Sequence, residues 1–202
     1  MEKRYPELYA LVKPFLETRD NEVHTRVAFE FALVLLAAEG GDPDVVLPAV
    51  MLHDIGWKFI PEDLHLQAFG PGANDMEINR MHEVEGSKKA REILEALGYD
   101  PQRIREIVEI ILGHDSRLEA LSLNDSLVKD SDKLWRFSAQ ALEIDPKRFK
   151  IEPAVHAEWL KHQIDKWFFT ETAKRLAREE QRQRAFHYGP PPKTVDRWRR
   201  QS

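Results

Sequence analysis

Apolar residues recur at the spacing of one helix face along most of this 202-residue chain. No stretch of four or more residues alternates between apolar and polar in the way a half-buried strand does. The sequence therefore predicts an all-α fold, a helical bundle, and its length fits a single domain. Hydrophobic residues make up 42% of the chain, which is enough for a packed core and argues against disorder.

Caps and breakers divide this pattern into helices. Asp20 and Asn21 precede one helix, and Asp-Pro pairs at 42–43 and 100–101 open two others, because aspartate followed by proline is a strong helix start. Residues 55–79 are rich in Pro, Gly and Asp and are expected to form a long loop, and Asp145-Pro146 indicates a turn. The helices are expected over 6–18, 22–39, 43–54, 80–97, 101–113, 125–138 and 153–186.

Composition excludes several classes of protein. The chain has no cysteine, which excludes disulfide scaffolds, thiolate catalysis and iron–sulfur clusters. A net charge of −5 argues against an extended nucleic-acid surface. The most apolar stretch, 27–38, is too short to cross a bilayer and the N-terminus lacks the apolar core of a secretory signal, so a cytoplasmic protein without membrane contact is expected. The basic segment 189–202 is expected to be a flexible tail.

Four histidines lie on the apolar stripes of four different predicted helices: His24, His53, His82 and His114. A single histidine on such a face is usually a hydrogen-bonded core residue. Four of them would each need a buried partner, which is costly, whereas one shared metal site satisfies them together. Asp54 follows His53 at a helix end and can reach the same site. Imidazole and carboxylate without thiolate suit iron, manganese, zinc, nickel or cobalt.

A further carboxylate is expected from residues 128–135. Asp130 and Asp132 both lie on this predicted helix, each on a stripe with apolar residues, and spacing alone does not choose between them. Each could instead be a solvated or capping carboxylate, the commoner role of aspartate.

His24, the sequence Leu-His-Asp-Ile-Gly at 52–56 and Asp132 within Asp-Ser-Asp-Lys-Leu resemble the signature of the HD-domain metal-dependent phosphohydrolase superfamily. The resemblance covers about residues 20–137. It implies an HD-type helical domain over 1–188 with a metal-binding core at about 20–138. It also implies that His24, His53, Asp54 and Asp132 hold a metal, since the family's aspartate precedes a basic residue and leucine.

His82 and His114 resemble the two additional histidines of the superfamily's dinuclear branch, with Asp54 as the bridge between two metals. The cyclic-dinucleotide hydrolases of that branch have Gly-Tyr-Pro after the last histidine, where this chain has Asp-Ser-Arg at 115–117. They also have a lysine where Trp57 stands, so cyclic-dinucleotide specificity is not expected. Trp57 and Phe59 are expected to pack the loop rather than to stack on a base.

The expected function is metal-dependent hydrolysis of a nucleotide or other small phosphate ester, with metal-activated water as the nucleophile. Asp54, Glu83 and Asp115 are the predicted catalytic or orienting groups, although Glu83 fits equally well as a charge at a helix start. The cations beside the proposed ligands are the candidate phosphate contacts, and each could instead be a solvated surface cation: Lys58, Arg80 and Lys133.

Two other functions fit the same residues. The first is a mixed-valence diiron oxygenase of the superfamily, which shares the layout from His82 to His114, but its substrate lysine after the last histidine is not found. The second is a non-catalytic ligand-binding module, against which the complete ligand set argues. A small phosphorylated substrate is the expected partner, and a homodimer is compatible with the charged helix near the C-terminus.

Overall fold

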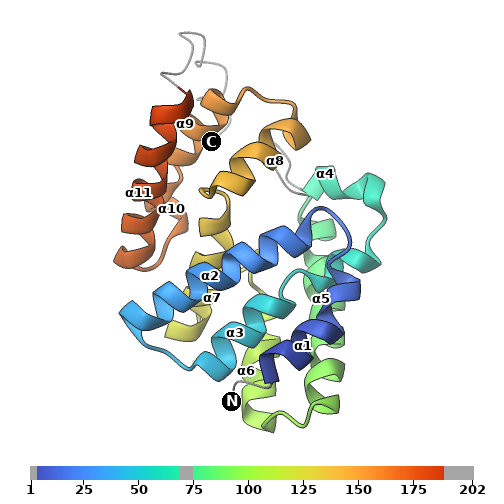
Figure 1. Ribbon diagram of the computed structural model, residues 1–202. Helices are drawn as coiled ribbons and strands as arrows, with labels where there is room; N and C mark the ends of the chain where they lie inside the picture. The colour runs from blue at the N-terminus through green and yellow to red at the C-terminus, as the bar shows by residue number, and fades with distance from the viewer. Residues whose placement is uncertain (1–3, 69–74, 189–202) are drawn as a thin grey trace.

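Three helices from distant parts of the chain form the centre of the computed structural model (Figure 1): α2 (Asn21–Glu39), α3 (Pro43–Leu52) and α7 (Leu123–Trp135). Each of the three packs against the other two. The structure describes residues 4–68 and 75–188, and within these ranges there are helices and turns but no strand. The predicted all-α fold is therefore confirmed.

Two groups of helices cover this centre on opposite sides (Figure 1). The first group packs on α3 and consists of α1 (Arg4–Val12), α5 (Met76–Ala96) and α6 (Pro101–Ile111). In the second group α11 packs on α7 and α2, and the group consists of α8 (Ala139–Phe149), α9 (Pro153–Lys161), α10 (Ile164–Trp167) and α11 (Glu171–Tyr188).

The predicted helix starts at the Asp-Pro pairs are confirmed. The Asp42 carboxylate accepts a hydrogen bond from the Asp44 amide, and Asp100 accepts from the amides of Gln102 and Arg103. These bonds satisfy amide groups that have no partner within the helix, while the proline at the first position needs none. The helices thus begin where the local chemistry predicts.

The expected loop over 55–79 is partly wrong. It contains two 3₁₀ turns, η2 (Ile55–Phe59) and η3 (Glu62–Leu64), and a short helix α4 (His65–Ala68), and α5 begins at Met76 rather than at residue 80. The start of α5 is capped by Asp75, whose carboxylate accepts from the amides of residues 77 and 78. Buried side chains give this segment a small core of its own: Trp57, Ile60, Ala68 and Ile78.

The single helix expected over 153–186 is instead the three helices α9, α10 and α11. The buried carboxylate of Asp130 accepts hydrogen bonds from the Phe169 amide and from both the amide and the hydroxyl of Thr170. These bonds hold an extended break ahead of α11, where the Thr170 hydroxyl also accepts from the Ala173 amide. A long-range contact therefore breaks a segment whose local pattern is helical.

The turn expected at Asp145-Pro146 is also wrong, because Pro146 lies inside α8. Leu142, Asp145 and Pro146 are all buried, so tertiary packing overrides the local breaker signal.

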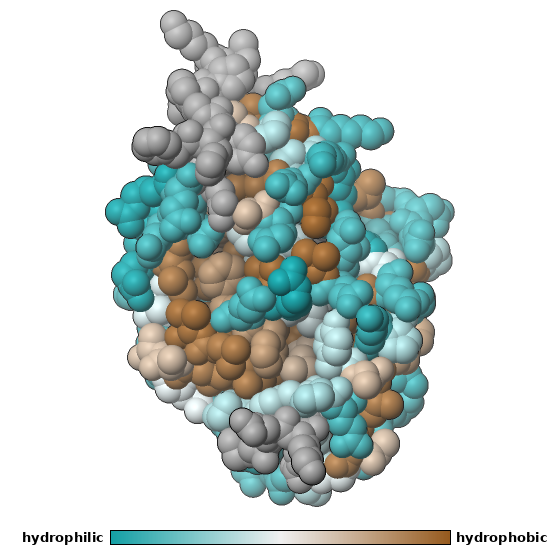
Figure 2. All heavy atoms as spheres, viewed as in Figure 1, coloured by the Kyte–Doolittle hydropathy of each residue, from teal (hydrophilic) through white to brown (hydrophobic). Residues whose placement is uncertain are grey.

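Among the described helices, none combines the length and the apolar character that a membrane span requires. Figure 2 shows apolar side chains gathered over α2 on the face in view. Leu33 and Val34 of α2 are exposed. The expected homodimer stays a prediction, and the predicted flexible tail at 189–202 lies outside the described residues.

Candidate metal centre

Six of the predicted ligand residues come from five segments and meet in the interior. His24 lies in the first turn of α2, His53 and Asp54 end α3, and Asp132 lies on α7. His82 lies within α5, and His114 follows α6. All six are buried, with at most 7% of any one exposed.

One half of the cluster surrounds His24. Its Nε2 lies 3.0 Å from Asp132 Oδ1, and its Nδ1 lies 3.2 Å from Asp54 Oδ2. The Nε2 atom of His53 lies 3.6 Å from Asp132 Oδ1 and 3.7 Å from Asp54 Oδ2. The structure therefore brings together the four residues that the sequence assigned to a first metal, and it places Asp132 in the site and Asp130 outside it.

The other half surrounds two histidines whose Nε2 atoms lie 3.2 Å apart, His82 and His114. Asp54 Oδ1 lies 3.9 and 3.7 Å from these atoms, and Asp115 Oδ2 lies 3.8 Å from each. Asp54 thus turns one oxygen to each half of the cluster. Asp115, predicted as a catalytic or orienting group, stands where it can also be a ligand.

The donors fit a divalent cation. His53 and His114 each donate from Nδ1 to a carbonyl oxygen three residues earlier, at 2.8 Å, and so present Nε2 to the cluster. These carbonyls belong to the last turns of α3 and α6, where helical partners are missing. His53 Nε2 is buried without a hydrogen-bond partner among the described residues, as expected of an atom that binds a metal.

The acids of the cluster are held ionised. Burial raises the pKa of Asp54, but His53, His114 and His24 together bring it well below its ordinary value. Burial also raises the pKa of Asp132, but Lys133, His24 and His53 bring it well below its ordinary value. At His24 burial lowers the pKa, and hydrogen bonds to the two aspartates outweigh it and raise the pKa.

The two histidines of the other half, His82 and His114, differ in protonation. Burial and the neighbouring His114 lower the pKa of His82 to about 4. Burial also lowers the pKa of His114, but the hydrogen bond to Asp54 and the charges of Asp115 and Glu83 raise it to about 9. His114 therefore holds the proton between the two Nε2 atoms, and a cation held by both rings would displace it.

Glu83 positions the residues that follow His114 through hydrogen bonds. Its fully buried carboxylate accepts from the amides of Asp115 and Ser116, at 2.9 and 2.8 Å, and from the Ser116 hydroxyl at 2.6 Å. It therefore fixes the turn that carries Asp115. The interpretation of Glu83 as a helix-start charge is wrong, because α5 begins at Met76 and Glu83 lies well inside it.

The three predicted phosphate contacts differ in position. Lys133 lies at the cluster, with its Nζ 2.5 Å from Asp115 Oδ1 and 2.7 Å from Asp132 Oδ2. Burial lowers its pKa, but these two carboxylates raise the pKa above its ordinary value. Arg80 is instead engaged with Glu83 and the Leu112 carbonyl, and Lys58 is exposed, so the structure does not bring these two to the cluster.

A hollow opens beside the cluster, with a cavity volume of about 20 Å³. Its lining includes five residues of the site, His24, Asp54, Asp115, Asp132 and Lys133, and three arginines that sequence reasoning missed: Arg19, Arg136 and Arg148. Arg136 stands four residues after Asp132, one helical turn on, and that spacing could have identified it. The space holds about one water, so long side chains at its mouth must swing aside to admit a phosphate ester.

Aromatic rings frame the cluster. Trp57 is 1% exposed, stacks on His82 at 4.1 Å between ring centroids, and donates from Nε1 to Asp54 Oδ1 at 3.0 Å. Trp135 stacks on His24 at 5.1 Å. Trp57 thus packs within the protein, as expected, and it also orients two of the proposed ligands.

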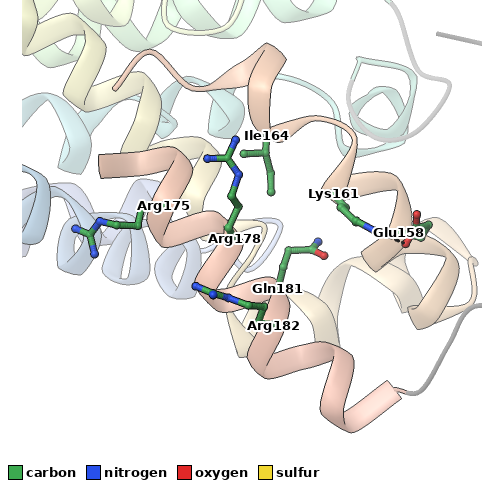
Figure 3. Close-up of a pocket in the computed structure, with 7 residues that line it drawn as sticks. All are labelled: Glu158, Lys161, Ile164, Arg175, Arg178, Gln181 and Arg182. Carbon is green, nitrogen blue, oxygen red and sulfur yellow. Dashed lines mark ion pairs between the residues drawn. The ribbon is translucent and has the colours of Figure 1, made fainter. Parts of the chain in front are cut away.

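A larger hollow of about 530 Å³ lies between α9, α10 and α11 (Figure 3). It is lined by Ile164 and six polar or charged side chains, with Arg175, Arg178, Gln181 and Arg182 rising from α11. None of the predicted site residues lines it. The chemistry that the sequence predicts therefore belongs to the smaller, buried hollow.

The chain is similar to known proteins. The family model described as HD domain matches residues 22–136. A Bacillus subtilis (strain 168) protein named "Putative phosphohydrolase YueE" is 33% identical over 101 residues, which are 46% of this chain and 53% of that protein. The matched part thus spans about half the length of this relative.

A solved structure shows the same fold. A "predicted HD superfamily hydrolase" from an uncultured Thermotogales bacterium superposes with a TM-score of 0.61 and 21% sequence identity. The superposition covers 90% of this chain and 87% of that one. Both ends of the metal cluster, from His24 to Asp132, lie within the segment matched by the family model.

Proposed function

Because the chain belongs to the HD-domain family, we propose that it is a metal-dependent hydrolase of a small phosphate ester such as a nucleotide, either a monoester or a diester. The observation that carries this proposal is the buried cluster in which Asp54 lies between two sets of imidazole and carboxylate donors. The phosphohydrolase named among the relatives supports the same class of reaction.

The residues divide into two ligand sets that share Asp54. His24, His53 and Asp132 would hold one cation, and His82, His114 and Asp115 would hold another. When bound, such cations lower the pKa of water toward ~7 and neutralise negative charge on phosphoryl oxygens.

Lys133 is the cation best placed for the phosphoryl group. Its ammonium bridges Asp115 and Asp132, and its side chain is 21% exposed, so the ammonium can turn toward an entering anion. Because its pKa is raised, it stays charged over the physiological pH range.

Asp115 is the group best placed to carry protons between the cluster and solvent. Its side chain is 26% exposed, whereas those of Asp54 and Asp132 are at most 7% exposed. The Asp115 amide donates a hydrogen bond to Glu83, and the Lys133 ammonium donates one to the Asp115 carboxylate. Burial raises the pKa of Asp115, but Lys133 and His114 bring it well below its ordinary value, so this carboxylate stays ionised and suits accepting a proton from water rather than donating one.

The test combines elemental analysis with a panel of phosphomonoesters and phosphodiesters. Asp54→Ala should remove bound metal and lower hydrolysis by more than about 100-fold, because loss of supporting groups alone costs up to that factor. Asp63→Ala removes an exposed carboxylate from the turn after Trp57 and serves as the matched control, with unchanged metal content and rate.

Two results would overturn the proposal. Full phosphate release by Asp54→Ala would show that the cluster does not carry the reaction. Bound iron with substrate-dependent oxygen consumption, and no phosphate released from any ester, would replace the hydrolase by an oxygenase.

A further inference from the structure

Three arginines from separate segments line the hollow, and we call Arg19, Arg136 and Arg148 the arginine wall. Arg19 precedes α2, Arg136 follows α7, and Arg148 lies in α8. The side chains of Arg136 and Arg148 are only 18% and 15% exposed. Three guanidinium groups therefore share one enclosed space with the proposed metal ligands.

A buried carboxylate positions two of these arginines. Asp145 is fully buried, and its two oxygens lie 3.3 Å from Arg136 Nη1 and 3.1 Å from Arg148 Nη1. A single aspartate thus holds two guanidinium groups side by side. Because like charges repel, this arrangement costs free energy that a purely structural role does not require.

The third arginine is held in an uncommon backbone conformation. Arg19 and Asp20 both have φ of +57°, in the left-handed region that residues other than glycine avoid. Arg148 Nη2 donates to the Arg19 carbonyl oxygen at 2.5 Å and to Asp20 Oδ2 at 3.0 Å, which holds this bend. The Arg19 guanidinium then lies 3.8 Å from the ring centroid of Trp57, the residue that donates to Asp54.

The charges in the hollow point to an anion larger than one phosphate. The metal side carries three aspartates and Lys133, a net charge of −2 when all are ionised, so one divalent cation would cancel this charge and a second would make it positive. The arginine wall adds three guanidinium groups to the same hollow, where Asp145 and Asp20 pair with Arg136 and Arg148. Planar guanidinium forks match the oxygens of phosphate groups.

We propose that the arginine wall binds a second phosphate group of the substrate, while the phosphate to be released lies at the metal ligands. The enzyme would then select phosphate esters that carry two or more phosphates over those that carry one. This proposal rests on the proposed function, since it assigns the specificity of the same site. The second phosphate can adjoin the first, as in a nucleoside diphosphate, or sit on another hydroxyl, as in a nucleoside bisphosphate.

The experiment compares three substrates of the metal-loaded protein: AMP, ADP and adenosine 3′,5′-bisphosphate. At least one of the two doubly phosphorylated compounds should have a kcat/KM about tenfold higher than that of AMP, or more. This is the factor that one hydrogen bond to a charged group contributes. Which of them does so tells where the second phosphate lies. Equal kcat/KM for all three would overturn the proposal.

Arg136→Gln should lower that preference about tenfold, because it removes one guanidinium from the wall. Arg105→Gln removes an exposed arginine from α6 and should leave the preference unchanged. An equal loss for AMP and for the preferred compound would contradict the proposal, since the wall would then bind the reacting phosphate. If Arg136→Gln fails to fold, Arg136→Lys keeps the charge without the fork and should lose part of the preference.

Calorimetry separates this proposal from the proposed function. If no ester is hydrolysed, the hydrolase proposal fails, but pyrophosphate should still bind the metal-loaded protein about tenfold more tightly than inorganic phosphate. Arg136→Gln should abolish that difference. Equal binding of the two anions to the wild-type protein would refute the arginine wall as a second phosphate site.

Discussion

Replacing Gly56 by alanine tests how the second half of the cluster is positioned. Gly56 lies in η2, which packs on α5 where that helix carries His82. A Cβ atom at Gly56 would lie 1.8 Å from the His82 carbonyl oxygen and 2.7 Å from the Gly86 amide nitrogen. The glycine is therefore required by space, since its φ is not in the left-handed region. This is the glycine of the His-Asp-Ile-Gly sequence.

The magnitude follows from that contact. Ordinary contacts of a Cβ begin at 3.4 Å, so α5 and η2 must separate by about 1.6 Å, the difference between 3.4 and 1.8 Å. Forcing atoms into a packed core costs about 1–3 kcal/mol, and a clash with backbone lies at the upper end. Metal ligands tolerate displacements of only about 0.2 Å. Gly56→Ala should therefore move His82 out of the cluster as well as destabilise the fold.

Urea denaturation and elemental analysis measure both effects. The urea midpoint should fall by roughly 1 M, for a loss of about 3 kcal/mol and a slope of about 3 kcal/mol/M. Metal bound by His82, His114 and Asp115 should be lost. Gly86→Ala is the matched comparison, because its Cβ would lie 3.2 Å from the Gly56 amide nitrogen, so the same contact must open by only about 0.2 Å and the losses should be much smaller. Wild-type stability and metal content in Gly56→Ala would refute the reasoning.

Two predictions concern protons. His156 is buried, its ring nitrogens have no hydrogen-bond partner among the described residues, and burial lowers its pKa from 6.5 to about 4. The unfolded chain then binds more protons below pH 6.5, so the unfolding free energy should fall by about 2 kcal/mol from pH 6.5 to 5. His156→Leu should remove this part of the pH dependence in urea titrations, and an unchanged dependence would contradict it. Metal binding at neutral pH should release a proton from His114, whose pKa is about 9. Because protons compete with the metal for this ring, the affinity of the protein for the metal should weaken as the pH falls. Calorimetry in buffers of different ionisation enthalpy detects that proton, and heats independent of the buffer would contradict the assignment.

Local chemistry explains how much of the fold could be predicted. A cap such as Asp42 or Asp100 acts on amides two or three residues away, and helix faces repeat within one or two turns. Such features are visible in the sequence, and the helices they define lie where they were expected. The four histidines were identified for the same reason, since each lies on an apolar stripe within one helix.

Long-range contacts explain what could not be predicted. Asp130 bonds to residues about 40 positions later, and this contact divides the expected C-terminal helix. Nothing near Asp145 in the sequence indicates that it bridges Arg136 and Arg148 rather than starting a turn. Spacing left Asp130 and Asp132 open, the resemblance favoured Asp132, and the structure gave each a different partner.

The sequence by itself determined the helical class, most helix starts and the residue types that gather at the cluster. Only the tertiary structure decided that Asp54 faces both halves of that cluster and that the arginine wall lines the hollow beside it. The physical reason is distance along the chain. Helix formation depends on neighbours within a few residues, whereas a site depends on how separate helices pack, and that packing is set by the whole core at once.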